Sequence, residues 1–160
     1  MQLKEIPDVK DWNQDLEKAS LMENWELQIS SQMLPQKCPK LTTLLLSNCD
    51  IKSISECFFE QKHELIILDL SYNDIKSLPN SIANLETLTT FLLHECNFLE
   101  KVSSFSKLEA LKKLDLGKIK IKDILHGMKR LINLKYLDLS GMRITEMDDE
   151  ILADSHSFSS

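Results

Sequence analysis

The chain has 160 residues, of which 42% are hydrophobic and 28% are charged, and its net charge is −6. This length suits one domain, and this hydrophobic content can fill a continuous core, which excludes a wholly disordered chain. The acidic balance argues against a general nucleic-acid binder, because contact with phosphates needs a clustered basic face. We therefore expect a folded domain that has no nucleic-acid partner.

The sequence also bears on membrane insertion and export. Its longest aliphatic runs, at 44–46 and 65–68, are far shorter than the roughly 20 residues of a membrane-spanning helix. The first ten residues carry charges and a proline where a secretory signal needs about 7–15 apolar residues. None of the eight asparagines starts a glycosylation sequon, and the four cysteines lack close paired spacing. We expect no membrane span, no export signal in these residues, and a reducing cytoplasmic setting.

Residues 1–15 are polar and are predicted to be a lead-in or linker. A repeat follows, with apolar residues at positions 1, 4 and 6, a small or amide residue at position 9, and an apolar residue at position 11. We predict that the repeat domain covers 16–152 and that 153–160 form a polar tail. The turns of the repeat start near residues 16, 41, 65, 88, 111 and 134, in steps of 23 to 25 residues.

The pattern within each turn predicts its local structure. Alternation from position 3 to position 7 predicts a short strand, and strands of successive turns then stack in parallel about 4.8 Å apart. The spacing of three from Phe105 through Leu108 to Leu111 predicts a 3₁₀, short helical or loop segment on the convex side. We therefore predict an α/β solenoid of about six turns, with short parallel β-strands on its concave face.

Position 9 is predicted to turn inward and to form a structural ladder along the stack. There the amides of Asn24 and Asn73 can bond to backbone groups that the loop leaves unpaired, while Cys49 and Cys96 offer a weaker thiol donor. Cys49 and Cys96 lie two turns apart, about 10 Å, which exceeds the limit of about 7 Å for a disulfide. We therefore predict that both are structural thiols.

Five stretches of the repeat carry a resemblance to a known family. They are LEKASLMEN at 16–24, CPKLTTLLLSNCDI at 38–51, LIILDLSYNDIKSL at 65–78, LPNSIANLETLTTFLLHEC at 78–96 and LINLKYLDLSGMRI at 131–144. They resemble the leucine-rich-repeat region of plant intracellular disease-resistance proteins, in particular the nucleotide-binding class with an N-terminal coiled coil. The resemblance covers roughly residues 1 to 152.

The resemblance implies a function in protein recognition and self-restraint. In that family the repeat region acts as a sensor and a clamp on a nucleotide-binding module. The implied partners are that module of the same receptor, a pathogen effector or a guarded host protein. The implied location is the cytoplasm or, through a region outside this sequence, the inner face of the plasma membrane. The phosphate loop G-x-x-x-x-G-K-[ST] does not occur in the sequence, so we expect this chain to bind no nucleotide and no other cofactor.

One triplet, His94, Glu95 and Cys96, invites a catalytic or metal-binding interpretation. By the repeat pattern, however, Cys96 points inward and His94 points outward, so the two side chains diverge. The triplet also lacks the ligand spacing and the third partner that such chemistry needs. We therefore predict no catalytic residue, no metal ligand and no small-molecule substrate, which means that the chain is not an enzyme.

The concave face is the predicted partner-binding surface, because apolar and aromatic residues occur there although packing of the core does not require them. Asp115 and Asp138 occupy the same position of adjacent strands, a like-charge pair that costs stability unless a basic group covers it. The alternative is that Asp is simply common in strands of the LDLS type. The predicted partner-binding residues are Leu45, Ile67, Asp69, Tyr72, Leu92, His94, Asp115, Tyr136 and Asp138.

A second hypothesis is a free-standing intracellular leucine-rich-repeat scaffold that binds a signalling protein. A regular Asn at every ninth position and proper end caps would favour this scaffold, and both are missing from the sequence. A secreted repeat receptor would predict sequons and a signal peptide, and neither is found.

Overall fold

A computed structural model describes residues 12–23, 38–100, 102, 105–121 and 128–142. Asn24, most of the predicted lead-in and the predicted tail lie outside these described residues. Within them the chain forms β-strands and 3₁₀ helices. None of the helices described is long and apolar enough to cross a membrane.

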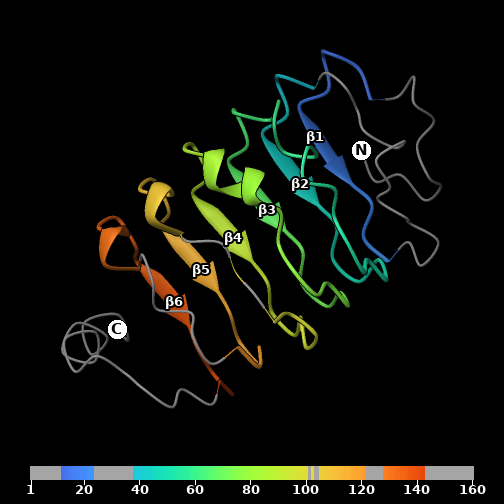
Figure 1. Cartoon of the computed structure of the whole chain (residues 1–160). Helices are drawn as coiled ribbons and strands as arrows, with labels where there is room; N and C mark the ends of the chain where they lie inside the picture. Colours follow the sequence, from blue (N-terminus) through green and yellow to red (C-terminus); the bar gives the residue numbers. More distant parts are fainter. Residues whose placement is uncertain (1–11, 24–37, 101, 103–104, 122–127, 143–160) are drawn as a thin grey trace.

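The strands form one six-stranded parallel sheet in sequence order, which runs as a band along one side of the molecule (Figure 1). Each strand begins two residues after the predicted start of a turn, so the repeat places every strand at positions 3 to 5. The predicted α/β solenoid of parallel strands is therefore confirmed. The strands are β1 (Lys18–Ser20), β2 (Thr43–Leu45), β3 (Ile67–Asp69), β4 (Thr90–Leu92), β5 (Lys113–Asp115) and β6 (Tyr136–Asp138).

The core lies behind the sheet and is continuous from turn to turn. Because side chains alternate along a strand, the middle residue of each strand points inward. Leu44, Leu68, Phe91 and Leu114 are 0% exposed at this position and stack directly on one another. No turn could bury this row of side chains alone, so the stack stabilises each of its members.

Three 3₁₀ helices close the core on the side opposite the sheet, as the spacing of three predicted. They are η3 (Asn80–Asn84), η4 (Phe105–Lys107) and η5 (Met128–Arg130). Each buries an apolar side chain against the stack, namely Ile82, Phe105 or Met128. The ring of Phe105 meets that of Phe91 edge to face, with 6.4 Å between the ring centroids. The convex side is therefore packed against the back of the strands.

Position 8 of every turn adopts the left-handed backbone conformation, with φ between 55° and 74°. Side chains other than glycine clash there with the backbone, at a cost of roughly 1–2 kcal/mol per residue. In the first five turns a bond between turns accompanies this conformation: the N–H of position 8 donates to the carbonyl oxygen of position 7 in the next turn. The residues are Glu23, Asn48, Tyr72, Glu95, Lys118 and Gly141, so only the last avoids the clash.

One buried lysine was not predicted. Lys62, in the segment between β2 and β3, is 2% exposed, and its Nζ donates to the carbonyl oxygen of Phe58. The same Nζ lies 4.4 Å from the centroid of the Phe58 ring. Burial disfavours the charged ammonium and lowers the pKa of Lys62 to about 8.

We expect Lys62→Met to remove a pH-dependent loss of stability. The pKa of Lys62 is about 8 in the folded chain, so between pH 8 and about 10.4 the unfolded chain binds more protons than the folded chain. Burial of this lysine therefore lowers the free energy of unfolding least at high pH. The excess stability of the variant over the wild type should therefore shrink by about 2 kcal/mol between pH 7 and pH 10. Urea unfolding of both proteins across this range measures the difference, in which the titrations of groups that do not interact with Lys62 cancel. A constant difference would contradict the buried charge.

Candidate functional site

The register of the sheet arranges seven of the nine predicted partner-binding residues in two rows on the concave face, and the other two, Tyr72 and His94, follow the ends of β3 and β4. Strand position 5 places Leu45, Asp69, Leu92, Asp115 and Asp138 beside one another on successive strands. Strand position 3 forms the second row, in which Thr43, Ile67, Thr90, Lys113 and Tyr136 are successive neighbours.

Exposure differs among these residues. Tyr72 and Tyr136 are 50% and 44% exposed, whereas Leu45, Ile67 and Leu92 are half-buried between their neighbours. The surface thus offers two accessible aromatic rings above partly covered aliphatic side chains. Such rings are common anchors at protein interfaces, but partner binding by these residues stays a prediction.

The three aspartates of the position-5 row share a local structural role. Each accepts a hydrogen bond from the backbone N–H two residues further on, which holds the chain as it leaves the strand. This gives a physical reason for Asp in LDLS-type strands. The donors are Ser71 to Asp69 at 2.9 Å, Gly117 to Asp115 at 3.0 Å and Ser140 to Asp138 at 2.8 Å.

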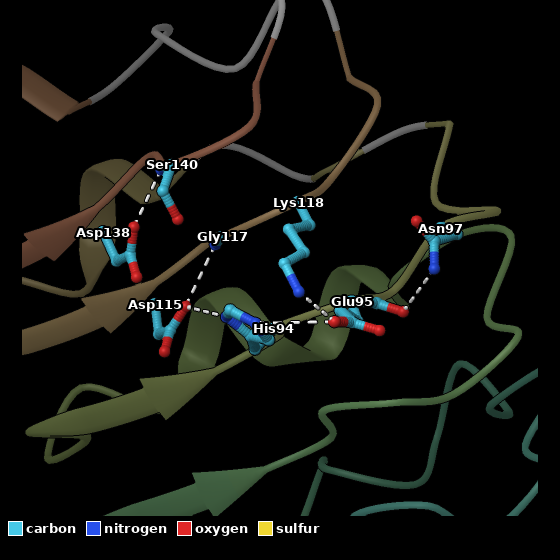
Figure 2. Close-up of polar contacts among 8 residues, drawn as sticks. All are labelled: His94, Glu95, Asn97, Asp115, Gly117, Lys118, Asp138 and Ser140. Carbon is cyan, nitrogen blue, oxygen red and sulfur yellow. Dashed lines mark hydrogen bonds and ion pairs between the residues drawn. The ribbon is translucent and has the colours of Figure 1, made fainter.

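His94 lies beside the aspartate pair. Its Nδ1 lies 3.1 Å from Oδ1 of Asp115, the register neighbour of Asp138. Figure 2 shows the imidazole reaching from the end of β4 toward the carboxylate of Asp115 on β5. One ligand atom from each of His94, Asp115 and Asp138 lies within 4.8 Å of the others. The bond from the Ser140 N–H, together with attraction to His94, holds the pKa of Asp138 below its usual value.

The repeat pattern places these three residues on one face but does not bring His94 to the pair. The pattern aligns equal positions of adjacent strands, whereas His94 is at position 7 and reaches position 5 of the next turn. Gly117 makes this approach possible, because a Cβ at Gly117 would stand 2.6 Å from Nδ1 of His94. A glycine at position 7, one turn after a histidine at that position, is the signal that was overlooked.

Two neighbours border His94. The ring of Tyr72 lies 5.6 Å from the imidazole, centroid to centroid. On the other side, Oε1 of Glu95 is 3.9 Å from Nε2 of His94 and pairs with Lys118. The hydrogen bond from Lys118 keeps the pKa of Glu95 below its usual value, so Glu95 remains ionised.

At position 9, Asn73 is 1% exposed and bonds to two turns at once. Its Oδ1 accepts the N–H groups of Cys49 and Ile51, each at 3.0 Å. Its Nδ2 donates to the carbonyl oxygens of Leu46 and Leu70, each at 2.8 Å, and of Ser71 at 3.2 Å. This one side chain therefore satisfies five buried backbone groups.

The buried thiols at position 9 make fewer bonds. Cys49 donates to the carbonyl oxygen of Leu21 at 2.9 Å, and Cys96 donates to that of Leu70 at 3.2 Å. All four cysteines of the chain are free thiols. Burial raises the pKa of Cys96 to about 12, so its thiol stays protonated at neutral pH and makes a poor nucleophile.

The described part of the chain also has an open depression on the convex side, along η3 and η4. It is lined mostly by polar and charged residues, two of them carboxylates, and Oγ of Ser81 is buried there without a hydrogen-bond partner. It brings together no histidine or cysteine, unlike the concave face. The lining residues are Glu56, Glu60, Asn80, Ser81, Ala83, Asn84, Ser106 and Lys107.

The repeat, the parallel sheet and the turn geometry define the class of the protein. Models of the leucine-rich repeat match residues 39–98 and 133–154, and the chain belongs to the leucine-rich-repeat family. Disease resistance proteins UNI and RPS5 of Arabidopsis thaliana are each 34% identical to it over 143 residues, or 89% of this chain. The chain is therefore a leucine-rich-repeat region of the plant disease-resistance type. It spans 16% of the length of these two relatives.

Solved structures agree on the fold. Internalin C2 of Listeria monocytogenes matches 88% of this chain and 58% of its own chain, with a TM-score of 0.70 and 20% identity. The leucine-rich-repeat domain of the type III effector XopL matches 87% of this chain and 49% of its own, with a TM-score of 0.73 and 21% identity. At this identity the likeness concerns the solenoid alone.

Proposed function

We propose that the chain is the non-catalytic protein-recognition and autoinhibitory repeat module of a plant immune receptor. The observation that carries the proposal is the concave face, where Tyr72 and Tyr136 are 50% and 44% exposed. Aromatic rings of this kind lose little conformational entropy on binding, and they bury a large area against a partner. The likeness to the disease-resistance proteins supplies the biological setting.

The partner in the resting state is a nucleotide-binding module of the same receptor. The two relatives named above are about six times longer than the part that this chain matches, which leaves room for such a module. In the proposed mechanism the concave face holds that module inactive, and a pathogen effector or a modified host protein displaces it. We place the receptor in the cytoplasm, or at the inner face of the plasma membrane through another region.

The chemistry of the described residues suits recognition better than catalysis. The buried thiols are engaged in the ladder, and the aspartates of the strands hold the backbone at the ends of β3, β5 and β6. Displacement of one protein partner by another needs only a difference between their binding free energies, and no covalent bond has to form or break. We therefore propose no substrate for this module.

We expect Ile67→Glu to disrupt this recognition. Ile67 is half-buried in the middle of the concave face, with Thr43 and Thr90 beside it. A carboxylate at that point stays hydrated in the free chain but loses its water against a partner, which is costly without a counter-ion. When the repeat region and the nucleotide-binding module are expressed as separate chains, the variant should weaken their co-precipitation about tenfold or more. In the full receptor it should trigger cell death without a pathogen.

The matched control is Ile132→Glu, because Ile132 is 82% exposed and lies ahead of β6, outside both rows. It should bind and restrain like the wild type. Thermal melts of both variants check that each remains folded. Equal effects of the two substitutions, or no effect of Ile67→Glu in a folded protein, would contradict the proposal.

A further inference from the structure

The cluster of His94, Asp115 and Asp138 carries an inference that the repeat fold does not require. These residues come from three successive turns, and one ligand atom from each lies within 4.8 Å of the others. We infer that they form a binding site for a divalent transition-metal ion, with Zn²⁺ as the best match, on the concave face. This replaces the expectation from sequence that the chain has no metal ligand.

The distances are close to those of a bound ion. Ligand atoms about 2.1 Å from Zn²⁺ in a tetrahedral arrangement are about 3.4 Å from one another. Nδ1 of His94 and Oδ1 of Asp115 are already 3.1 Å apart. The ligand atom of Asp138 lies within 4.8 Å of the other two, so it has to approach by up to about 1.4 Å, which a rotation of a partly exposed side chain provides.

The backbone orients both carboxylates in advance. The N–H of Gly117 holds Oδ1 of Asp115, and the N–H of Ser140 holds Oδ1 of Asp138. Each carboxylate therefore keeps a fixed direction. Because a carboxylate oxygen has two lone pairs, Oδ1 of Asp115 can accept the bond from Gly117 and still face Nδ1 of His94. Bonds of this kind around metal ligands raise the affinity of a site, because less freedom is lost on binding.

The charges call for a cation. Asp115 and Asp138 are register neighbours on β5 and β6, so two negative charges lie side by side. Among the described residues, no lysine or arginine pairs with either carboxylate, and Lys118 is paired with Glu95. A divalent ion offsets both negative charges, and the imidazole of His94 lies beside them as a nitrogen ligand.

The donor set selects the kind of ion. Mg²⁺ and Ca²⁺ prefer oxygen ligands throughout, whereas one imidazole nitrogen with two carboxylates suits Zn²⁺. Three protein ligands leave at least one coordination position for water or for a side chain of a partner. The inference stands whether or not the proposed immune function is correct, because it concerns only these three side chains.

Isothermal titration of the 160-residue chain with Zn²⁺ alone tests the site. We expect saturable binding of one ion per chain, and Asp138→Asn should weaken it at least tenfold while the Asn oxygen still accepts from Ser140. Asp69→Asn is the matched control, since Asp69 makes the same bond to Ser71 on β3 outside the cluster. It should bind Zn²⁺ like the wild type.

Gly117→Ala tests the geometry without removing a ligand. The added Cβ would stand 2.6 Å from Nδ1 and 2.8 Å from Cε1 of His94, so the imidazole has to move away. The φ angle of Gly117 is not among the positive ones, so alanine fits the backbone. We expect this variant also to bind Zn²⁺ at least tenfold more weakly.

Thermal melts with and without Zn²⁺ complete the test, because an ion that binds only the folded state raises the melting temperature. The wild type and Asp69→Asn should be stabilised by Zn²⁺, and Gly117→Ala should not. If Asp138→Asn fails to fold, Gly117→Ala decides between the outcomes. The absence of one-to-one binding, or equal affinity in the wild type and Gly117→Ala, would overturn the inference.

Discussion

Replacing Asn73 by leucine should lower the free energy of unfolding by about 3 kcal/mol or more. The substitution removes five hydrogen bonds and leaves the buried N–H groups of Cys49 and Ile51 without an acceptor. A buried polar group that loses its partner costs about 1–3 kcal/mol, and such losses at one site do not simply add. Urea unfolding followed by circular dichroism measures the change.

Two variants serve as controls for this prediction. Asn97→Leu makes the same substitution at an exposed residue that bonds only to its own loop, and its effect should stay within about 0.5 kcal/mol. Asn73→Cys installs the thiol that other turns use, and should lose less stability than Asn73→Leu. If Asn73→Leu cost no more than Asn97→Leu, the ladder would contribute nothing to stability.

The second large effect is expected for Leu114→Ala, at about 2–5 kcal/mol. Leu114 is 0% exposed in the middle of β5, between Phe91 on β4 and Leu137 on β6. The substitution loses the transfer free energy of the removed atoms and leaves a cavity that the rigid strands can only partly fill. Thermal and urea unfolding should show the loss directly.

The loss should also spread along the stack, because each turn is stabilised by its neighbours. We therefore expect faster amide exchange in β4 and β6, as well as in β5, in the Leu114→Ala variant. Ile132→Ala, at a residue that is 82% exposed, should change the stability by no more than about 0.5 kcal/mol. Wild-type behaviour of Leu114→Ala would mean that the register of the repeat is wrong.

The repeat period was enough to predict the sheet. Only one register between neighbouring strands buries the apolar side chains of every turn. The spacing of Leu111, Leu114 and Leu116 was therefore enough to predict where β5 lies in the sequence. The same spacing predicted the 3₁₀ helices, because Phe105 and Leu108 both face the core. These features follow from hydrophobic periodicity, which a single sequence displays.

Other features escaped the periodic analysis because they depend on contacts between different positions. His94 meets Asp115 across two positions of the pattern, and the space at Gly117 permits it. Lys62 lies in an irregular segment, where the pattern gives no inward or outward direction, so its burial was not visible. The half-burial of Leu45 and Ile67 likewise depends on the neighbouring strands, not on alternation alone.

The left-handed residue at position 8 links surface variation to folding. The left-handed conformation at this position favours glycine or asparagine. Tyr72, Glu95 and Lys118 adopt it although it is unfavourable for their side chains. Every substitution at this position therefore alters both the surface and the stability of the stack. The residues at this position can vary only as far as the core tolerates the strain, so tightly packed turns should be the ones that carry the most unusual residues there.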